Sequence, residues 1–298
     1  MRPVSGYRIV KLVNGSHSVH SLAEGETFHP VVGPLTEADA LYVRQLDLVA
    51  RARDCMGRGE TFVVWDIGLG AAANPATFLR ALETSPCDVE IVSFDHTLEP
   101  LRFALSQAEY LPYLAGFEEP LRALVKDRRI CFGGAGQRIC WSVWERDFPG
   151  LVRGADAEAW PKPHAIMFDA FSPAKNPAMW TEPVFQRIFE LLDPKRPCAL
   201  PTYSRSTLLR VTLLLAGFFV GIGAPIGEKE ETTIAANTLE LIGRPLGCAW
   251  LDRARRSSSA EPLWSPDYRQ APLSKQSWER LRTHPQFAAC PGLGSVQP

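Results

Sequence analysis

The chain has 298 residues, of which 46% are hydrophobic and 22% charged, and its formal net charge is −1. This composition is typical of a globular protein with a sizeable core and excludes a highly charged disordered chain. The near-zero charge also excludes a uniformly basic nucleic-acid-binding protein, and we interpret the local cluster of Arg253, Arg255 and Arg256 as a solvated surface run.

Residues 1–58 are predicted to form an N-terminal extension. The run 7–16 is typical of a β-hairpin, because Asn14-Gly15 is a favoured two-residue turn between strands. The run 36–54 predicts a single helix with apolar residues near one face. The first six residues lack the apolar core of a signal peptide.

From Thr61 onward, strand-like and helical segments alternate. This alternation predicts an α/β fold with a doubly wound, mostly parallel sheet covering residues 59–250. A last strand, at 233–236 or 239–242, is expected to pair antiparallel. The tail 251–298 shows little periodicity, so we expect it to wrap the surface or to stay partly mobile. The expected strands are 62–67, 89–94, 139–143, 165–168, 198–202 and 218–222; the expected helices are 75–83, 99–109, 118–125, 182–192 and 206–216.

A glycine-rich turn, Gly68-Leu69-Gly70, directly follows the first of these strands, which carries Asp66 near its end. Such a turn lets a ligand approach the backbone and presents helix N-terminal amides to an anion. Ala73 replaces the third glycine of a dinucleotide-binding turn, which a relaxed pattern allows, and Asn74 follows it. The pattern predicts a cofactor site with contacts at Asp66, Gly68, Gly70 and Asn74, although close packing of helix on strand explains a lone pair of glycines almost as well.

Acids at the ends of the next two strands sharpen this prediction. Asp95 follows the glycines by about twenty-five residues, near the spacing of a ribose-binding acid, and a carboxylate can accept hydrogen bonds from both ribose hydroxyls. Asp147 can accept a hydrogen bond from an adenine amino group while Phe148 packs on the ring. S-adenosylmethionine (SAM) fits better than NAD, because its carboxylate can use the glycine turn and the late antiparallel strand suits a methyltransferase sheet.

Asp169 ends the apolar run 165–168 and opens a loop that Pro173 and Pro177 stiffen. An acid at the carboxyl end of a parallel strand lies where open α/β sheets bind ligands. Such a loop can hold a carboxylate, a lysine (Lys175) and an amide (Asn176) around a substrate. The alternative is an ordinary connection in which Asp169 is a structural cap.

The cysteines form no CxxC pair, so we expect neither a metal site nor a disulfide framework. Small buried cysteines favour a reducing compartment, and we expect a cytoplasmic protein. The most apolar stretch, 208–226, contains Arg210 and several glycines, so we interpret it as a helix and a strand and expect no membrane span. The seven cysteines are Cys55, Cys87, Cys131, Cys140, Cys198, Cys248 and Cys290.

Three blocks of sequence resemble a known family. They are the loop Asp169-Ala170-Phe171-Ser172-Pro173-Ala174-Lys175-Asn176-Pro177-Ala178-Met179-Trp180, the Thr202-Tyr203-Ser204 segment with Arg210 and Ala216-Gly217-Phe218, and Gly227 with Lys229 before Thr232-Thr233. Upstream, Gly25-Glu26-Thr27-Phe28-His29-Pro30 is similar to the family's entry segment. Over roughly residues 25–243, the chain resembles the methyltransferase domain of the bacterial bifunctional enzyme that completes 5-methylaminomethyl-2-thiouridine at the tRNA wobble position, and its stand-alone relatives.

The resemblance implies a Rossmann-like class I SAM-dependent methyltransferase that methylates an exocyclic aminomethyl nitrogen of tRNA. It places the catalytic aspartate at Asp169 and cofactor contacts at Gly68, Gly70, Asp95 and Asp147. The family's turn usually continues Thr-Gly-Leu-Asn, whereas this chain has Ala71-Ala72-Ala73-Asn74, which stiffens the turn. The family's flavin-dependent oxidoreductase half has no counterpart here, so we expect a separate oxidoreductase partner upstream in the pathway.

The expected reaction is the attack of an amine nitrogen on the sulfonium methyl, which needs no metal. An alkylammonium has a pKa of about 10, taking lysine as a guide, so the protein must supply a neutral amine. Asp169 can hold the amine and help to remove its proton. Aromatic residues can stack on a base and polar ones can bind a phosphate or a base edge, although Trp180 is equally well explained as core. The candidate substrate residues are Phe171, Lys175, Asn176, Trp180, Tyr203 and Lys229.

Two other functions stay open. The first is a methyltransferase acting on a small-molecule or protein amine, which the near-neutral charge favours because tRNA binding usually needs several phosphate contacts. The second is a methyltransferase-like binding module without turnover, which the altered alanine turn motivates. Fold alone does not decide the substrate.

Overall fold

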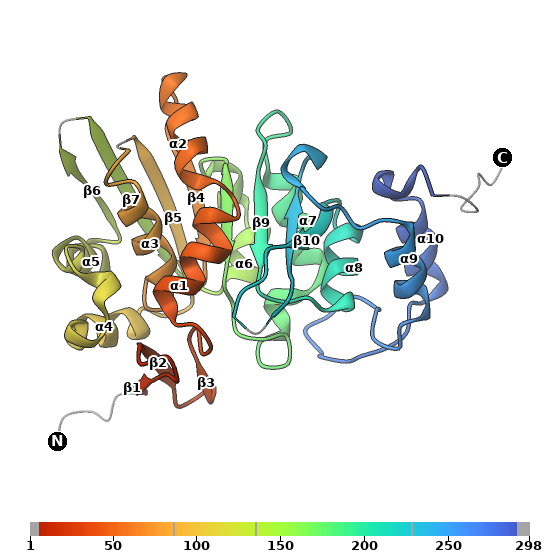
Figure 1. Cartoon of the computed structure of the whole chain (residues 1–298), viewed down its shortest axis with the longest axis horizontal. Coiled ribbons are helices and arrows are strands. Elements are labelled where there is room, and N and C mark those ends of the chain that lie inside the picture. Colours follow the sequence, from red (N-terminus) through yellow and green to blue (C-terminus); the bar gives the residue numbers. More distant parts are fainter. Residues whose placement is uncertain (1–5, 86, 135, 228, 291–298) are drawn as a thin grey trace.

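The structure is a computed structural model that describes residues 6–85, 87–134, 136–227 and 229–290. An eight-stranded sheet in the order β10-β11-β9-β8-β4-β5-β7-β6 forms its centre, with helices on both faces (Figure 1). The strands are β4 (Phe62–Ile67), β5 (Val89–Asp95), β6 (Arg129–Gly134), β7 (Gln137–Glu145), β8 (Ala165–Phe168), β9 (Ala199–Thr202), β10 (Phe219–Gly223) and β11 (Thr232–Ala236).

The strand directions confirm the predicted doubly wound sheet. Strands β7, β5, β4, β8 and β9 are parallel, and β11 pairs antiparallel with both β9 and β10. The reversed last strand is therefore Thr232–Ala236, and the alternative segment is a short 3-10 turn, Leu239–Leu241. Strand β6 was not predicted; it is an edge strand that pairs antiparallel with β7, and its exposed, glycine-ending sequence carries little strand signal.

Each face of the sheet covers its own hydrophobic core, because parallel strands buried on both sides need helices above and below. Every residue of β4 and β8 is buried. Four helices cover one face: α2 (Leu48–Gly57), α3 (Ala73–Ala81), α4 (Glu99–Ser106) and α5 (Glu118–Asp127). On the other face lie α6 (Phe148–Arg153), α7 (Glu182–Leu191) and α8 (Thr207–Leu215), and α9 (Cys248–Arg256) and α10 (Lys275–Arg282) extend the same core beyond α8.

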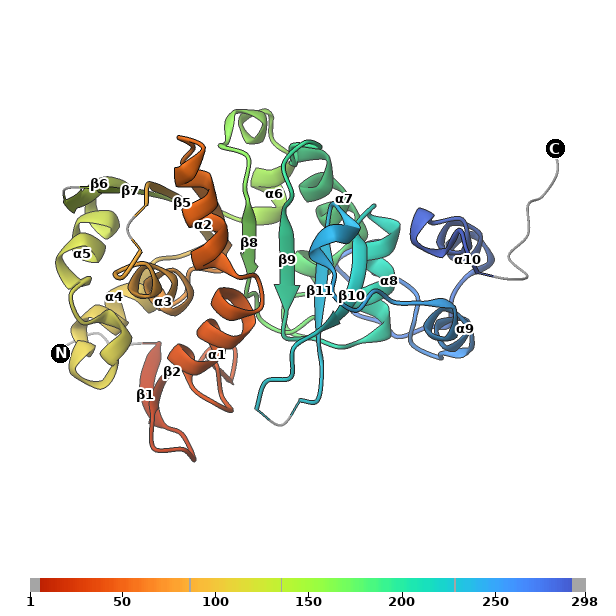
Figure 2. The ribbon, with the colours of Figure 1, turned by 45° about the horizontal axis from the view of Figure 1, so that its top comes forward.

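The N-terminal extension begins with the predicted hairpin, formed by β1 (Tyr7–Lys11) and β2 (His17–Ser21), to which the two residues of β3 (Glu26–Thr27) add. The single helix predicted over 36–54 is wrong. Instead there are α1 (Pro34–Ala38), a π-helical segment (Asp39–Arg44) and α2, because Asp47 adopts a left-handed backbone with φ of 48°. Figure 2 shows α1 and the hairpin beside the edge where β8 and β9 end.

The tail is more ordered than predicted. Helices α9 and α10 lie at the opposite end of the molecule from α4 and α5 (Figure 1), and Leu251, Leu281 and Phe287 are buried in the core under α7 and α8. The expected boundary at residue 250 falls inside α9. The periodicity of the tail is hard to see in the sequence because the two helices are short and a proline-containing stretch separates them. Residues 1–5, where no signal peptide is expected, and 291–298 lie outside the described part.

Four of the seven cysteines form disulfides, so the expectation of no disulfide is wrong. Cys131 and Cys140 face each other across β6 and β7, and Cys248 joins Cys290. Their sequence separations of 9 and 42 residues carry no recognisable motif. None of the helices in the described part of the chain has both the length and the apolarity needed to cross a bilayer.

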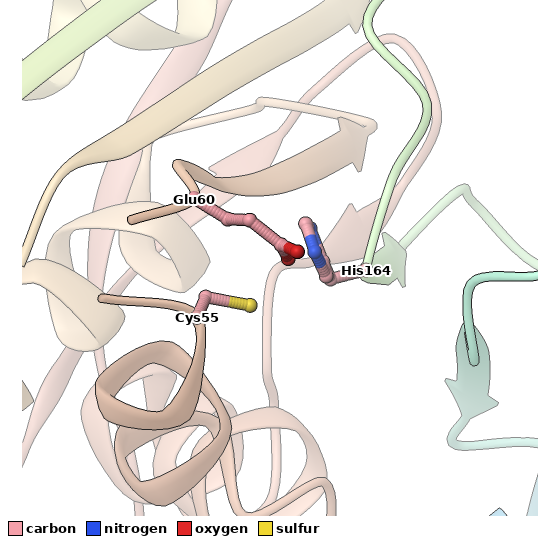
Figure 3. Close-up of side chains that lie close together, drawn as sticks. All are labelled: Cys55, Glu60 and His164. Carbon is pink, nitrogen blue, oxygen red and sulfur yellow. The ribbon is translucent and has the colours of Figure 1, made fainter. Parts of the chain in front are cut away.

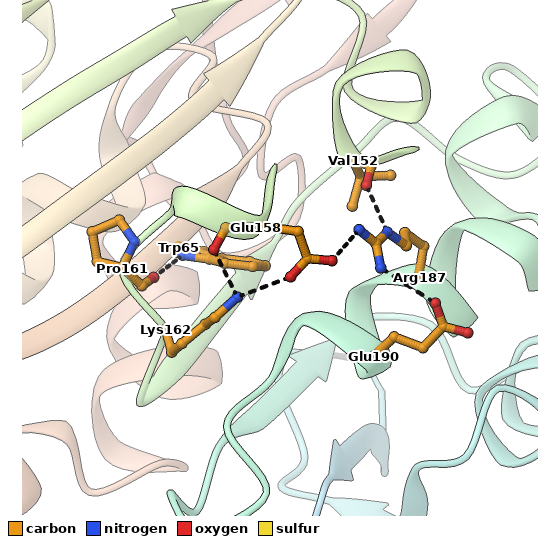
Figure 4. Close-up of polar contacts among 7 residues, drawn as sticks. All are labelled: Trp65, Val152, Glu158, Pro161, Lys162, Arg187 and Glu190. Atoms are coloured by element: carbon orange, nitrogen blue, oxygen red, sulfur yellow. Dashed lines mark hydrogen bonds and ion pairs between the residues drawn. The ribbon is translucent and has the colours of Figure 1, made fainter. Parts of the chain in front are cut away.

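An ionic network on the outer face braces the segment that leads into β8 (Figure 4). Glu158 pairs with Arg187 at 2.6 Å and with Lys162 at 3.8 Å, and Arg187 also reaches Glu190 at 3.4 Å. Beside it, Trp65 Nε1 donates to the carbonyl oxygen of Pro161 at 2.8 Å. These contacts tie the connection before β8 to α7 and to β4.

Candidate active site

A cavity of about 860 Å³ opens at the carboxyl edge of the sheet, where the ends of β4, β5, β8 and β9 converge. Residues 24–30 of the N-terminal extension form its other wall. Eleven of the thirteen residues predicted from the sequence line this cavity: Gly68, Gly70, Asp95, Asp147, Asp169, Phe171, Lys175, Asn176, Trp180, Tyr203 and Lys229. The remaining two, Asp66 and Asn74, do not.

The glycine turn packs directly against the end of β8. Gly68 has a φ of +94°, and a Cβ at this position would overlap the carbonyl oxygen of Asp169. Glycine is therefore required here both for the backbone conformation and for the close approach. Ala72 adopts a φ of 61° as the residue before α3, a left-handed conformation that costs an alanine free energy.

The acids after β5 and β7 hold backbone at the cavity wall. Asp95 Oδ2 accepts a hydrogen bond from the Gly70 amide at 2.9 Å, which links the end of β5 to the glycine turn. Its Oδ1 accepts from the Thr97 amide at 3.2 Å and lies 3.2 Å from His96 Nδ1. Asp147 caps α6, because its Oδ2 accepts from the Gly150 amide at 3.0 Å, and it lines the cavity as well.

Asp169 is held by two side chains on one of its oxygens. Asn74 Nδ2 donates to Asp169 Oδ2 at 2.9 Å, and His29 Nε2 lies 3.4 Å from the same atom. Burial raises the pKa of Asp169, although the positive charge of His29 and the hydrogen bond from Asn74 oppose this shift. The carboxyl group therefore has a raised proton affinity, as a proton acceptor at a cavity wall requires.

His29 and Glu37 are candidate site residues that sequence reasoning missed, and both line the cavity. His29 Nδ1 lies 3.1 Å from Glu37 Oε1, so its ring bridges Glu37 and Asp169. Burial alone would lower the pKa of His29, but the two flanking carboxylates outweigh it and raise the pKa to about 9. The signal was present in Gly25–Pro30, which matches the family's entry segment, but no chemistry in that segment distinguishes the histidine.

The expected cofactor contacts at Asp66 and Asn74 need correction. Asp66 is fully buried in the sheet, where Ser93 Oγ donates to its Oδ2 at 2.7 Å and Trp141 Nε1 donates to Ser93 Oγ at 2.9 Å. Burial raises the pKa of Asp66 to about 7. Its side chain points away from the cavity because alternate residues of a strand face opposite sides. Asn74, on α3, contacts the catalytic candidate Asp169 and not the cavity.

The loop after β8 and the end of β9 form the substrate side. Ser172 Oγ donates to Glu26 Oε1 at 2.8 Å, which fastens the loop to β3, and the ring of Phe171 lies 5.7 Å from that of Phe28. Trp180 lines the cavity but is 4% exposed, and its Nε1 donates to the Phe171 carbonyl at 2.8 Å, so core packing accounts for most of its surface.

Lys229 lies over the ring of Tyr203, with Nζ 3.5 Å from the ring centroid, and donates to the Tyr203 carbonyl at 3.0 Å. Burial lowers the pKa of Lys229. Lys175 is exposed at the rim, and the backbone amides of Lys175 and Asn176 both donate to the Ser172 carbonyl at 2.9 Å. These residues offer cations and aromatic faces to a ligand that enters beside Asp169.

A second polar cluster lies away from the cavity (Figure 3). Ligand atoms of Cys55, Glu60 and His164 lie within 4.8 Å of one another. However, His164 Nδ1 accepts from the Val63 amide at 3.0 Å, so Nε2 carries the ring proton and neither nitrogen has a free lone pair. Arg58 also donates to both Cys55 Sγ and Glu60 Oε2, each at 3.2 Å. The cluster therefore does not fit a metal ion, and the absence of a metal from this protein stays a prediction.

Comparisons with known proteins show the family of this chain. Residues 134–238 match a family described as S-adenosyl-L-methionine-dependent methyltransferase. The chain is 30% identical over 255 residues to the tRNA 5-methylaminomethyl-2-thiouridine biosynthesis bifunctional protein MnmC of Methylibium petroleiphilum, covering 80% of this chain and 36% of that protein. For MnmC of Aeromonas hydrophila the values are 29% over 221 residues, 70% and 32%. The chain thus spans about a third of the length of these relatives.

Solved structures show the same fold. MnmC2 from Aquifex aeolicus is 25% identical with a TM-score of 0.67, covering 94% of this chain and 84% of that chain. Spermidine synthase from Thermotoga maritima has a TM-score of 0.52 at 11% identity, which supports the fold alone. The predicted Rossmann-like architecture and the resemblance of these sequence blocks to the MnmC methyltransferase domain are confirmed.

Proposed function

We propose that this chain, an S-adenosyl-L-methionine-dependent methyltransferase related to the methyltransferase domain of MnmC, methylates the aminomethyl nitrogen of a wobble uridine in tRNA. One observation carries the proposal. The carboxylate of Asp169 lies on the cavity wall where the end of β8, with its substrate-side loop, meets the glycine turn. A methyl donor on that turn and an amine beside the loop would both be next to this carboxylate.

The residues present fit an adenosyl cofactor. The cavity of about 860 Å³ is of the size that small-molecule sites have. Gly68 and Gly70 keep the turn free of side chains, and Asp95 and Asp147 provide acceptors on the same wall for ribose and adenine groups. When bound, SAM supplies an activated methyl group on a positively charged sulfur, so the protein needs no nucleophile of its own.

The chain's own residues then have to orient a neutral amine and keep water out. The substrate ammonium has a pKa of about 10 in water, so a proton must leave before nitrogen can attack. Asp169 accepts that proton, and the loop that Ser172 fastens to Glu26 holds the amine in place. A base can stack on the aromatic side chains of Phe171 and Tyr203 and contact the edge of Trp180. A phosphate or a base edge can interact with the positive charges of Lys175 and Lys229.

The test is methyl transfer from labelled SAM to two tRNA preparations, one aminomethylated and one unmodified at the wobble uridine. Label should enter only the aminomethylated tRNA, and nucleoside mass spectrometry should locate it at that base. Transfer to free amines or proteins but to neither tRNA would favour the small-molecule or protein-amine alternative. Failure to bind SAM in isothermal titration would favour a binding module without turnover.

Two further parts of the proposal depend on this substrate. A separate oxidoreductase partner upstream in the pathway stays a prediction. Action on tRNA would place the enzyme in the cytoplasm. The cysteine pattern no longer supports that location, since four cysteines pair.

A further inference from the structure

His29 occupies an unusual position in the cavity wall. It belongs to the N-terminal extension, outside the sheet, and it is 9% exposed. Its backbone has a φ of 47°, which is strained for a residue with a side chain and persists only where the surroundings enforce it. The surroundings here are two carboxylates, at 3.1 Å from Nδ1 and 3.4 Å from Nε2. A protonated imidazole has two N–H groups, so it can hydrogen-bond to Glu37 through Nδ1 and form an ion pair with Asp169 through Nε2.

The charged and titratable groups around His29 come from several elements. Asp169 follows β8, Glu37 is on α1, and Lys229, in the connection between β10 and β11, is close enough to Glu37 for their charges to interact. Tyr42, on the π-helical segment, donates its hydroxyl to the Phe168 carbonyl at 3.1 Å, and burial and the charge of Asp169 raise its pKa. Negative charge therefore dominates the immediate surroundings of the ring and favours its protonated form.

The two carboxylate oxygens of Asp169 differ in their contacts. Asn74 and His29 both approach Oδ2, and no hydrogen bond to Oδ1 is found among residues 6–85, 87–134, 136–227 and 229–290. The side chain of Asp169 keeps 31% of its surface exposed and lines the cavity. Oδ1 is thus available to an amine while Oδ2 is held. The Oε2 atom of Glu37 is buried with no partner in the same part of the chain, so Glu37 is committed to His29.

We propose that His29 is a positioning residue for Asp169: clamped by Glu37, it keeps the Asp169 carboxylate ionised and fixes its orientation, so that Oδ1 can take the proton of the substrate amine. In that step the N–H bond of the ammonium breaks, the proton goes to Oδ1, and the electron pair stays on nitrogen. Nothing is oxidised or reduced. This role rests on the proposed function, because it requires an amine beside Asp169.

The experiment compares the wild-type chain with His29→Gln, Glu37→Gln and the control His17→Gln. His17 lies on β2 of the same extension, beside Tyr110 and away from the cavity. The readouts are kcat as a function of pH with SAM and aminomethylated tRNA, the KM for SAM, and a melting curve for each variant. Loss of the cation should raise the pKa of Asp169, so the acid limb of kcat should move upward by about one pH unit or more. Below the midpoint of the wild-type acid limb, kcat should fall about tenfold, with the KM for SAM unchanged.

Glu37→Gln removes the partner of His29 but also a carboxylate whose charge raises the pKa of Asp169, so the acid limb should move upward less than in His29→Gln. His17→Gln should leave it in place. A folded His29→Gln variant with the wild-type acid limb would overturn the proposal. If His29→Gln does not fold, NMR titration of the His29 ring in the wild-type chain and in Asp169→Asn decides. We expect a protonated ring at pH 7.5 in the wild type and a lower imidazole pKa in the variant; an equal pKa in both would also overturn it.

If the wild-type chain binds SAM but methylates no tRNA, the proposed substrate is wrong. The same NMR titration then still tests the coupling of His29 to Asp169, so the two failures are distinguishable.

Discussion

Two ionic clusters in this molecule join a cation to two carboxylates at similar distances. They differ in how far their side chains are exposed to water. In the cavity, His29 lies between Glu37 and Asp169 at 3.1 and 3.4 Å. On the outer face, Arg187 joins Glu158 and Glu190 at 2.6 and 3.4 Å (Figure 4). The side chains of Glu158 and Glu190 are 62% and 48% exposed, whereas those of His29 and Glu37 are 7% and 6% exposed. Water screens the outer network, where the ion pairs lower the pKa of the exposed Glu158, raise that of Arg187 and brace a loop. In the cavity, the buried ring of His29 between two carboxylates has its pKa raised to about 9.

Of the residues in the two clusters, Asp169 is expected to give the largest effect when it is changed. Asp169→Asn keeps the shape and removes the proton acceptor, so kcat should fall by about 10²–10⁴. The affinity for SAM should change little, because Asp95, Asp147 and the glycine turn remain. Single-turnover assays and isothermal titration measure the two quantities. Unchanged chemistry in a folded variant would remove Asp169 from the mechanism.

The glycine turn at the cavity is also expected to be destabilised by an added side chain. Gly68→Ala would place a Cβ against the Asp169 carbonyl in addition to the positive φ, and should cost about 3 kcal/mol of unfolding free energy. Gly116 is a matched control, since it has a φ of +85° with open space around it, and Gly116→Ala should cost only the conformational part, about 1–2 kcal/mol. Urea denaturation measures both. Equal costs would contradict the close contact.

The cluster of His29, Glu37 and Asp169 should make the free energy of unfolding depend on pH in a defined range. The pKa of His29 is about 9 in the folded chain against an ordinary value of 6.5, so its contribution is complete below pH 6.5 and is lost as pH rises through 9. The shift corresponds to at most about 3 kcal/mol. Chemical denaturation between pH 6 and 10 should show this loss in the wild type and a flatter profile in His29→Gln. Parallel profiles would mean that the ring is not charged.

A smaller gain is expected beside the cavity at Ala72. Because Ala72 has a left-handed backbone, Ala72→Gly should stabilise the chain by about 1 kcal/mol, seen as a higher melting temperature. It should leave the affinity for SAM unchanged if the turn already has the shape that the cofactor needs. A tighter SAM complex would instead show that the alanine turn strains the site.

The smallest effect is expected on the outer face. Arg187→Gln removes the charge that links Glu158 to Glu190, and the melting temperature should change by no more than about 3 °C. Methyl transfer should be unaffected. A larger shift would mean that the hydrogen bond from Arg187 Nε to the Val152 carbonyl, at 3.2 Å, matters more than the ion pairs.

The doubly wound, mostly parallel sheet and most of the cavity wall could be predicted, because parallel strands bring Gly68, Asp95 and Asp169 to one edge whatever the details of the loops. Asp66 failed because its side chain lies on a covered face of the sheet, where Ser93 donates to it. Asn74, on α3, donates to Asp169 instead of lining the cavity. His29 and the pairing of Cys248 with Cys290 could not be predicted, since both depend on contacts between segments far apart in sequence.

The hydrogen bond from the Tyr42 hydroxyl to the Phe168 carbonyl ties the N-terminal extension to the end of β8, beside the cavity. A shortened protein that started at β4 would keep the whole central sheet and the glycine turn. It would lose Tyr42, His29 and Glu37 together, and with them one wall of the chamber. Such a fragment would keep the residues proposed to hold the nucleoside of the cofactor. It would lack the enclosed cavity in which a substrate ammonium can lose its proton.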